Sequence, residues 1–309
     1  MGDSNLQTWK RNIAIEIKNI DIETVFTEWW ELKKLSVKPQ ELECLNGRSK
    51  IGCDLIDYYF FLNRLETVGN KGINFYDFIK NIDYYKTKKY IQNLLTYCYQ
   101  HNRYVDNDTK RYYYIYGLSF GRVNAFKITN ALSIYQKYKP STKNYLYSIM
   151  DPFCGFGGRL VGALLLNYNY IGIDLNVNLK PNYDRLLNDL GKKSSSKVTL
   201  LFQDAKDVDY SQYKYDMVFT SPPYGNIEVY ENGVRKTPDE WAQFYTVVFQ
   251  KLWDHLRNKD GVYAININVD IYHKYLVPLF GECEEKIELK KSTRNKKYKE
   301  FIYLWRKNV

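Results

Sequence analysis

The 309-residue chain predicts an α/β domain over residues 145–309, preceded by a mainly helical region over residues 1–144. In the second region, short apolar runs alternate with helical patterns, which is typical of a mostly parallel sheet with helices on both faces. The last two apolar runs, 285–290 and 301–306, follow each other without a helical pattern between them. They predict an antiparallel hairpin at the end of the sheet, joined by the basic segment 291–297.

In the helical region, apolar residues recur at helical spacing over 22–32, 54–65 and 75–99, and 122–138 also predicts a helix. We expect the tyrosines and tryptophans of the first three helices to lie in the core. Residues 102–121 are different, because they mix turn formers, basic residues and aromatic residues. That mixture suits either binding of phosphates and unpaired bases or a hairpin with inward-facing tyrosines, and both interpretations stay open.

Each element of the α/β region follows from a local pattern of apolar residues. The predicted strands are 145–151, 170–174, 198–204, 216–220 and 261–268. The predicted helices between and after them are 160–166, 179–190, 239–256 and 271–280.

The composition limits the classes of partner and compartment. Net charge is +10, and residues 71–143 hold 13 basic and 4 acidic residues, which favours an anionic partner such as nucleic acid. AT-rich coding would also enrich lysine and tyrosine, so charge alone is not specific. The five cysteines are scattered without metal-binding or disulfide spacing, and no run approaches 18 apolar residues. We therefore expect a cytoplasmic protein with no metal site and no membrane contact.

The stretch 215–225 joins an apolar strand pattern to Ser221-Pro222-Pro223-Tyr224. Two consecutive prolines end the strand and hold the next residues rigid at its carboxyl edge, where open α/β sheets bind ligands. There, the Ser221 hydroxyl and a main-chain carbonyl could accept both hydrogens of one amine, while Tyr224 lies against a flat ring. A surface turn with an exposed tyrosine is the alternative for these four residues alone.

A second motif, Asp-Pro-Phe-Cys-Gly-Phe-Gly-Gly at 151–158, lies between the first strand and the first helix. Glycine in such a turn permits positive φ and close approach of a ligand. Asp174 and Asp204 end the next two strands, where carboxylates can accept from a ribose diol and an adenine amine. Together with Asp151, they predict one pocket for an adenosyl group that carries an amino acid. The glycine patterns of nicotinamide and ATP sites are absent from the sequence.

The pair Asp151-Pro-Phe-x-Gly-x-Gly and Ser221-Pro-Pro-Tyr224 resembles the motifs of the S-adenosylmethionine-dependent amino-methyltransferases of DNA. The resemblance covers residues 145–309 and implies a seven-stranded Rossmann-like methyltransferase sheet. Serine at the first position of the second motif resembles the N4-cytosine enzymes more than the N6-adenine enzymes. The implied reaction is methylation of cytosine N4 in double-stranded DNA, with the target base flipped out of the duplex.

The resemblance also implies a role for each motif residue. The implied cofactor is S-adenosylmethionine. Its ribose would be held by Asp174 and its adenine by Asp204. Its methionine part would be held by four residues of the turn: Asp151, Phe153, Gly155 and Gly157. The target base would be held by Ser221 and the Pro222 carbonyl at its amine, with Pro223 fixing the loop and Tyr224 stacking on the ring.

Three alternatives remain beside cytosine N4 methylation. They are adenine N6 methylation in DNA, methylation of a base amine in RNA, and a non-catalytic nucleic-acid-binding protein on the same scaffold. In the family, this order of motifs usually accompanies a recognition region after the catalytic core. Because the sequence places none there, we expect residues 1–144 to recognise the nucleic acid.

Overall fold

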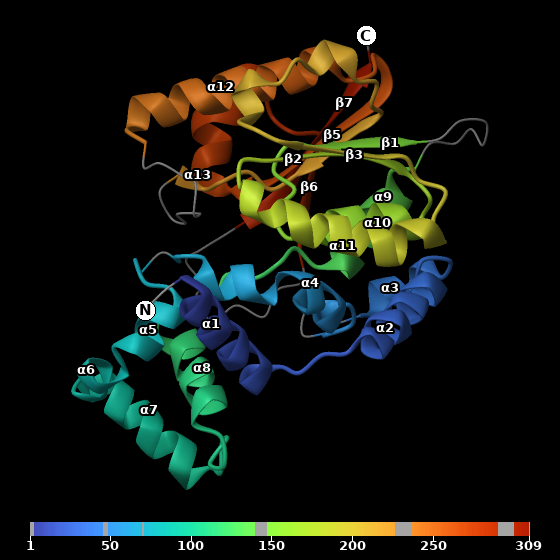
Figure 1. The fold of residues 1–309 in the computed structure, drawn as a ribbon. Helices are drawn as coiled ribbons and strands as arrows, with labels where there is room; N and C mark the ends of the chain where they lie inside the picture. Colours follow the sequence, from blue (N-terminus) through green and yellow to red (C-terminus); the bar gives the residue numbers. More distant parts are fainter. Residues whose placement is uncertain are drawn as a thin grey trace.

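The computed structural model describes residues 3–45, 49–69, 71–139, 147–225, 236–289 and 300–308. The described residues form one seven-stranded sheet covered by helices on both faces, with a helical region below it (Figure 1). The strands are β1 (Ser148–Asp151), β2 (Asn169–Asp174), β3 (Val198–Phe202), β4 (Met217–Thr220), β5 (Lys259–Asn268), β6 (Glu285–Glu288) and β7 (Glu300–Asn308).

The strand order is β3-β2-β1-β4-β5-β7-β6. Strands β1 to β5 are parallel, and β7 runs antiparallel between β5 and β6. The predicted seven-stranded α/β sheet with a terminal antiparallel hairpin is therefore confirmed. Strand order reverses between β1 and β4, so a ligand is expected at the carboxyl ends of these two strands. The predicted basic segment 291–297 lies outside the described residues.

The helices of the α/β region cover both faces of the sheet. They are α10 (Gly158–Leu165), α11 (Lys180–Leu190), α12 (Pro238–His255), α13 (Val269–Ile271) and α14 (Val277–Phe280), with a π-helical turn at Tyr272–Leu276 between the last two. Alternate strand residues point to opposite faces. Met217 and Phe219 pack with α10 and α11, whereas Val218 packs with α12.

The first region is helical as predicted, but its boundaries differ. Its helices are α1 (Asp3–Ile17), α2 (Ile22–Leu35), α3 (Pro39–Cys44), α4 (Cys53–Glu66), α5 (Phe75–Lys80), α6 (Ile82–Lys86), α7 (Lys89–Gln100), α8 (Asp108–Ser119) and α9 (Ile128–Lys137). The single helix expected over 75–99 is wrong, because the chain breaks at Asn81 and again at Thr87 and Lys88. The hairpin considered for 102–121 is also wrong. Asn107 caps a helix there by accepting from the Lys110 amide.

The sheet shares its core with part of the helical region. Residues of α2, α4 and α9 belong to the same buried cluster as α10 and α11, and Phe60 of α4 packs edge-on against Tyr183 of α11 at 5.0 Å between ring centroids. Contact between the two regions is close at Gly158, where an added Cβ would lie 1.9 Å from the Phe126 carbonyl oxygen. Residues 1–144 are thus partly built into the core of the sheet.

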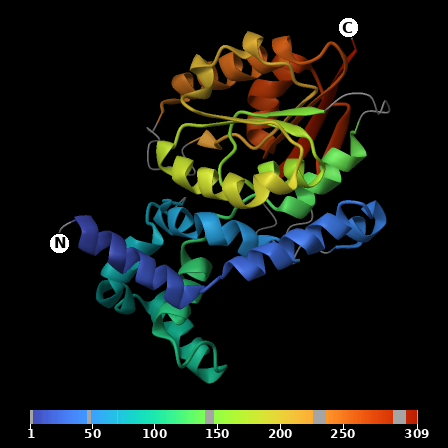
Figure 2. The ribbon, with the colours of Figure 1, turned by 45° about the vertical axis from the view of Figure 1, so that its right-hand side comes forward.

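A second, smaller core lies farther from the sheet. It combines residues of α1, α5, α7 and α8 with Phe61 and Leu65 on the outer face of α4. Figure 2 shows these helices extending away from the sheet. The expectation that the aromatic residues of the first helices are buried holds for Trp29, Tyr59 and Tyr76. The expectation is wrong for Trp30, which faces solvent on α2. It is also wrong for four tyrosines that are exposed: Tyr84, Tyr90, Tyr97 and Tyr99.

Within the described residues, every helix is too short or too polar to cross a membrane.

Candidate active site

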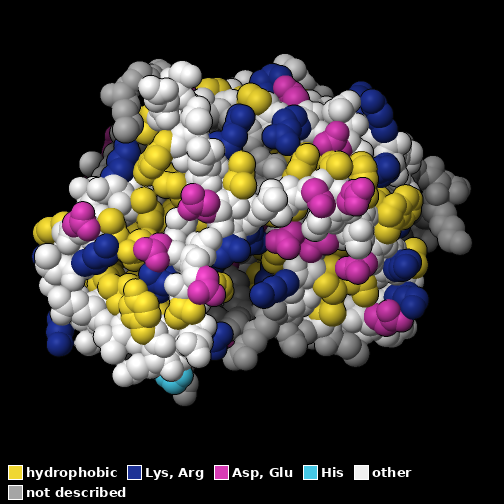
Figure 3. Space-filling model, turned by 60° about the horizontal axis from the view of Figure 1, so that its bottom comes forward, with side chains coloured by type: hydrophobic (Ala, Val, Ile, Leu, Met, Phe, Trp, Pro, Cys, Tyr) yellow, Lys and Arg dark blue, Asp and Glu magenta, His cyan; other side chains and the backbone are white. Residues whose placement is uncertain are grey.

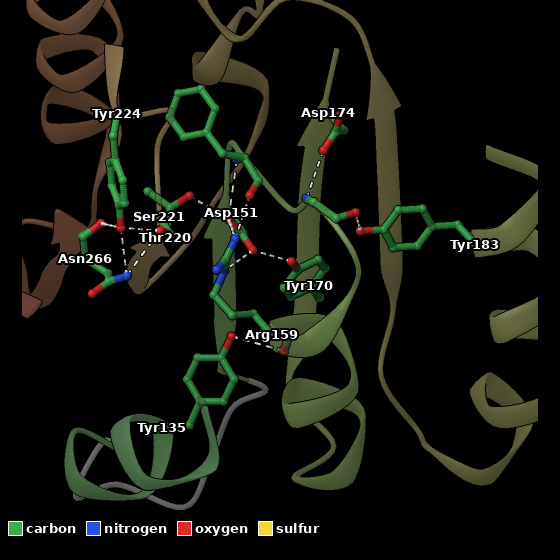
Figure 4. A network of polar contacts seen from close by, with 12 residues as sticks. Tyr135, Asp151, Arg159, Tyr170, Asp174, Tyr183, Thr220, Ser221, Tyr224 and Asn266 are labelled. Carbon is green, nitrogen blue, oxygen red and sulfur yellow. Dashed lines mark hydrogen bonds and ion pairs between the residues drawn. The ribbon is translucent and has the colours of Figure 1, made fainter. Parts of the chain in front are cut away.

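The two sequence motifs meet at the carboxyl ends of neighbouring strands. β1 ends at Asp151 and β4 at Thr220, and the strands pair with Met150 opposite Val218. Thr220 Oγ1 donates to Asp151 Oδ1 at 2.6 Å (Figure 4). The loop 221–225 and the glycine turn 152–157 therefore leave the sheet side by side, at the point where strand order reverses.

Asp151 is completely buried and holds the turn from inside. Arg159 Nε donates to Asp151 Oδ2 at 2.6 Å, and the Tyr170 hydroxyl also donates to this carboxylate. Arg159 in turn donates from Nη2 to the Phe153 carbonyl at 2.5 Å. Burial acts to lower the pKa of Arg159, but the Asp151 charge and hydrogen bond outweigh it, so the net pKa is raised. Both oxygens of Asp151 are thus engaged by protein groups, whereas Phe153 lies half-buried at the edge.

The two predicted glycines of the turn face different surroundings. Both have positive φ, 55° at Gly155 and 76° at Gly157. An added Cβ at Gly155 would meet only the Phe153 carbonyl oxygen, at 3.9 Å, so this side of the turn is open. At Gly157 it would lie 3.3 Å from the Phe60 ring. Gly155 therefore leaves room above the turn, whereas Gly157 permits close packing on α4.

Asp174 is tied to the same turn from the end of β2. It accepts from the Gly155 amide at 2.8 Å through Oδ2 and from the Asn176 amide at 2.9 Å through Oδ1. Burial raises the pKa of this carboxyl to about 6. Leu175 and Val177 beside it are exposed by 42% and 52%, which leaves an apolar surface next to the carboxylate. A ligand with a hydroxyl pair and an apolar ring would suit this combination.

Asp204, the last residue of the predicted cofactor pocket, differs in environment from Cys154, a residue of the turn that was not assigned to that pocket. Asp204 follows β3, the neighbour of β2, and its side chain is partly exposed. It accepts from the Lys206 amide at 3.0 Å, and its Oδ2 lies 3.8 Å from Lys206 Nζ. Cys154 is buried, and burial raises the pKa of its thiol well above the usual value. It is therefore a filler of the turn and a poor nucleophile.

Ser221 and Tyr224 are joined through their hydroxyl groups, which lie 2.9 Å apart. Asn266 on β5 donates from Nδ2 to both, at 3.1 Å each, as Figure 4 shows. Tyr224 also reaches Glu300 Oε1 at 2.9 Å, and Asn266 Nδ2 reaches the same oxygen at 2.6 Å. The tyrosine ring is therefore anchored at its hydroxyl end and held at one orientation beside Ser221.

Sequence reasoning missed Asn266 and Glu300. Asn266 is only 2% exposed, and its Oδ1 has no hydrogen-bond partner among the described residues. Its signal was available, since it is a polar residue inside the apolar run 262–267, next to β4. Glu300 offers no such signal, because it begins β7 after a charged segment of the sequence. Asn266 reaches Ser221 through the pairing of β5 with β4, and Glu300 reaches it through the pairing of β7 with β5.

Tyr245 of α12 clamps the proline loop from the other side. Its hydroxyl donates to the Pro223 carbonyl at 2.6 Å and accepts from the Gly225 amide at 2.9 Å. Among the described residues, none donates to the carbonyl of buried Pro222. Of the two proline carbonyls, Tyr245 therefore holds the one that was not predicted to face an amine.

The Tyr245→Phe variant should exchange the Gly225 amide proton about five- to tenfold faster, because it loses a hydrogen bond of about 1 kcal/mol. Hydrogen exchange followed by mass spectrometry or NMR measures this rate. Tyr215→Phe is the matched control, since its buried hydroxyl donates to the Leu252 carbonyl at 2.9 Å away from the loop. Equal exchange at Gly225 in both variants would contradict the clamp.

No protein-family model and no curated protein matches this sequence. Among solved structures, an rRNA methylase from Streptococcus thermophilus is 13% identical with a TM-score of 0.41, over 58% of this chain and 97% of that one. TrmN from Thermus thermophilus is 13% identical with a TM-score of 0.42, over 58% and 48%. NSun6 from Pyrococcus horikoshii with SFG is 19% identical with a TM-score of 0.38, over 52% of this chain and 47% of that one. This chain therefore spans about half the length of TrmN and of NSun6.

Proposed function

We propose that this chain transfers a methyl group from S-adenosylmethionine to the exocyclic amine of a base in nucleic acid. The observation that carries the proposal is the hydrogen bond between Thr220 and Asp151 at 2.6 Å. It joins the turn suited to an adenosyl ligand with the loop suited to a planar amine, although the two are 69 residues apart. Donor and acceptor of a transferred group need such adjacency, since transfer requires the reacting atoms to be held in line.

The residues at the turn fit S-adenosylmethionine. Asp174 presents a carboxylate beside the exposed apolar side chains of Leu175 and Val177, as a ribose joined to an adenine requires. The open side of Gly155 leaves space for the remainder of the ligand, and Asp204 stands at the end of the neighbouring strand. When bound, this cofactor supplies an electrophilic methyl group on a sulfonium. Asp151 and Arg159 would support the turn from inside, and Phe153 would border the ligand.

At the amine side, the hydroxyl network prepares Ser221 as an acceptor. A hydroxyl has one hydrogen and two lone pairs. If Tyr224 donates to Glu300, Ser221 donates to Tyr224 and accepts from Asn266, which leaves one lone pair on Ser221 for an amine hydrogen. The Pro222 carbonyl would take the second hydrogen. The amine lone pair would then point at the methyl group, while Glu300 favours the positive charge that develops on nitrogen.

Within this class we propose cytosine N4 of DNA as the target, because serine occupies the first position of the loop. A duplex buries this amine in the stack, so the base has to be flipped out before Ser221 and Tyr224 can hold it. The net charge of +10 supports a nucleic-acid substrate of either kind. Adenine N6 in DNA and a base amine in RNA are the alternatives.

The test is incubation of the chain with labelled S-adenosylmethionine and separate pools of DNA and RNA, followed by nucleoside digestion and mass spectrometry. N4-methylcytosine in DNA is the expected product. N6-methyladenine in DNA would keep the mechanism and overturn the inference from Ser221, whereas label only in RNA would change the substrate class. Cofactor binding without product in either pool would favour the non-catalytic alternative. The Ser221→Ala variant, purified in the same way, is the matched control for product made by a contaminating methyltransferase.

Cofactor affinity should depend on pH through Asp174, whose pKa is raised to about 6 by burial. Only the ionised carboxylate accepts from both ribose hydroxyls, so affinity is expected to be constant above about pH 7 and to fall about tenfold per pH unit below the pKa. Titration calorimetry between pH 5 and pH 8 measures this profile. The Asp174→Asn variant should bind the cofactor more weakly, with an affinity that does not change with pH. If its affinity fell with pH as steeply as that of the unchanged chain, the pH dependence would belong to another group.

A further inference from the structure

The exposed tyrosines of the described residues are confined to one part of the molecule. We call residues 81–122, which contain α6, α7 and α8, the arm. Five tyrosines are at least 38% exposed there, at positions 84, 90, 97, 99 and 104, and every other described tyrosine is buried or half-buried. Burial of a tyrosine ring is normally favourable. Five exposed rings within one arm therefore mark a surface that contacts something else.

The charge of the arm is positive and mostly not neutralised within the protein. Residues 81–122 hold 7 Lys and Arg against 3 Asp and Glu. Two of these cations are used internally, Lys86 with Asp83 and Arg111 with Asp108. The other five form no ion pair with any residue in the described ranges: Lys88, Lys89, Arg103, Lys110 and Arg122. Figure 3 views this side of the molecule and shows hydrophobic side chains among lysines and arginines.

The fold presents these rings from a rigid support. Ile91, Cys98 and Ile115 bury the inner side of α7 and α8 in the smaller core. Arg111, which is 3% exposed, donates from Nη1 to the carbonyls of Tyr104 and Val105, at 3.0 and 3.1 Å.

Those two bonds fix the loop between α7 and α8. Tyr104 has a φ of 54°, a conformation that costs a bulky residue free energy. Its side chain nevertheless remains 47% exposed. The buried arginine thus holds a strained loop that keeps an aromatic ring in solvent, which a purely structural loop would not need.

We propose that the arm binds a single-stranded segment of nucleic acid, with bases stacked on its tyrosines and phosphates near its unpaired lysines and arginines. Free base faces are available only where bases are unpaired, and stacking on aromatic side chains is the usual way of binding them. The phosphates of a duplex would neutralise the basic residues, but a duplex would offer no free base faces to the tyrosine rings. A neutral protein surface would leave the five cations without opposite charges. An acidic one would neutralise them but would not offer a flat face to each of the five rings.

This inference rests on the proposed function and narrows its substrate, because it predicts that a base in an unpaired segment is preferred to a base flipped out of a duplex. It also revises the expectation that the whole of residues 1–144 serves recognition. The part built into the sheet core, α2, α4 and α9, would support the fold, and the arm would hold the nucleic acid.

The test is fluorescence anisotropy with labelled 20-nucleotide probes, namely single-stranded DNA, single-stranded RNA and a DNA duplex of the same sequence. The full chain should bind the two single strands more tightly than the duplex. A Tyr97→Ala and Tyr99→Ala double variant should lose at least tenfold in affinity for single strands, since each stacked base contributes about 5- to 100-fold. Its affinity for the duplex should change less than twofold.

Trp30→Ala is the matched control, because Trp30 is 53% exposed on α2, outside the arm. It should bind all three probes like the unchanged chain. Lys89→Ala should weaken binding of both kinds of single strand and reduce the salt dependence of affinity. Wild-type affinity for single strands in the tyrosine double variant, or an equal loss with Trp30→Ala, would overturn the proposal, as would preference for the duplex.

Failure of this inference and failure of the proposed function give different results. Cofactor binding is measured separately and should be unchanged in the arm variants, because the arm does not contribute to the turn at Gly155. Loss of single-strand binding in the tyrosine variant, without methylated product from the unchanged chain, would keep the arm proposal and reject the reaction. Methylated product from the unchanged chain, together with unaltered single-strand binding by the tyrosine variant, would keep the reaction and reject the arm proposal.

Discussion

Replacing Arg159 with methionine is expected to lower the free energy of unfolding by about 3 to 5 kcal/mol. The substitution leaves the Asp151 carboxylate, which is 0% exposed, without its ion-pair partner, and removing one member of a buried pair carries this cost. It also frees the Phe153 carbonyl. Urea denaturation followed by circular dichroism measures the change.

Two further variants separate the ion pair from a general loss of packing. Lys180→Met removes a member of an exposed pair with Asp184 and should change stability by no more than about 0.5 kcal/mol. The double variant Arg159→Met and Asp151→Asn should recover part of the loss, because the buried charge is gone. The new amide oxygen can still accept from one of the two hydroxyls of Thr220 and Tyr170, and the amide NH2 can donate to the other. A single Arg159 variant as stable as the unchanged chain would contradict this account of the turn.

Ser221→Ala should reduce kcat by about 10²- to 10³-fold, with little change in the dissociation constant for S-adenosylmethionine. The size is that of losing one preorganised hydrogen-bonding group aimed at developing charge. Asp174→Ala should do the opposite, since this carboxylate is proposed to hold the ribose of the cofactor and accepts from the Gly155 amide of the turn. Single-turnover methylation and equilibrium binding of the cofactor provide the two quantities. Equal losses in both quantities for both variants would reject this division of roles.

The Glu300→Gln variant tests how much the hydrogen-bond network behind Ser221 contributes to the rate of methyl transfer. It keeps an oxygen that can accept from Tyr224 but removes the charge, so kcat should fall by about tenfold and cofactor affinity should stay constant. Lys137→Met is a control on the same β6–β7 side of the sheet, because it breaks an exposed contact with Glu285. Its kcat should match that of the unchanged chain.

The sheet was predictable because its signals are local. Apolar runs such as 216–220 end abruptly at a proline or an acidic residue, and β1, β2 and β4 end where these signals predict. Strand β3 ends at Phe202, two residues before Asp204. The helices of the first region were less predictable. The run 75–99 keeps a helical apolar spacing through two breaks, since Asn81 and Lys88 still allow Phe78, Tyr85 and Ile91 to face one core. Periodicity alone does not reveal such breaks.

The site could be predicted only as far as its two motifs. Asp174 and Ser221 were singled out because each lies where an apolar run ends, and their proposed roles stay predictions. The end of β1 at Asp151 was predicted, but its contact with Arg159 was not, because tertiary packing brings the guanidinium across the turn. Asn266 and Glu300 were missed for the same reason. They come from strands whose pairing brings them to Ser221 from 45 and 79 positions away in the sequence.

The shared core of α4, α9 and the sheet determines how this chain could be divided or recombined. A fragment beginning at residue 145 would expose the apolar face that Phe60 and Ile128 cover, so it should aggregate instead of folding as an autonomous enzyme. The arm is different, because replacing residues 81–122 would disturb only the smaller core. Replacement of the arm should therefore leave the fold of the sheet and of α2, α4 and α9 intact.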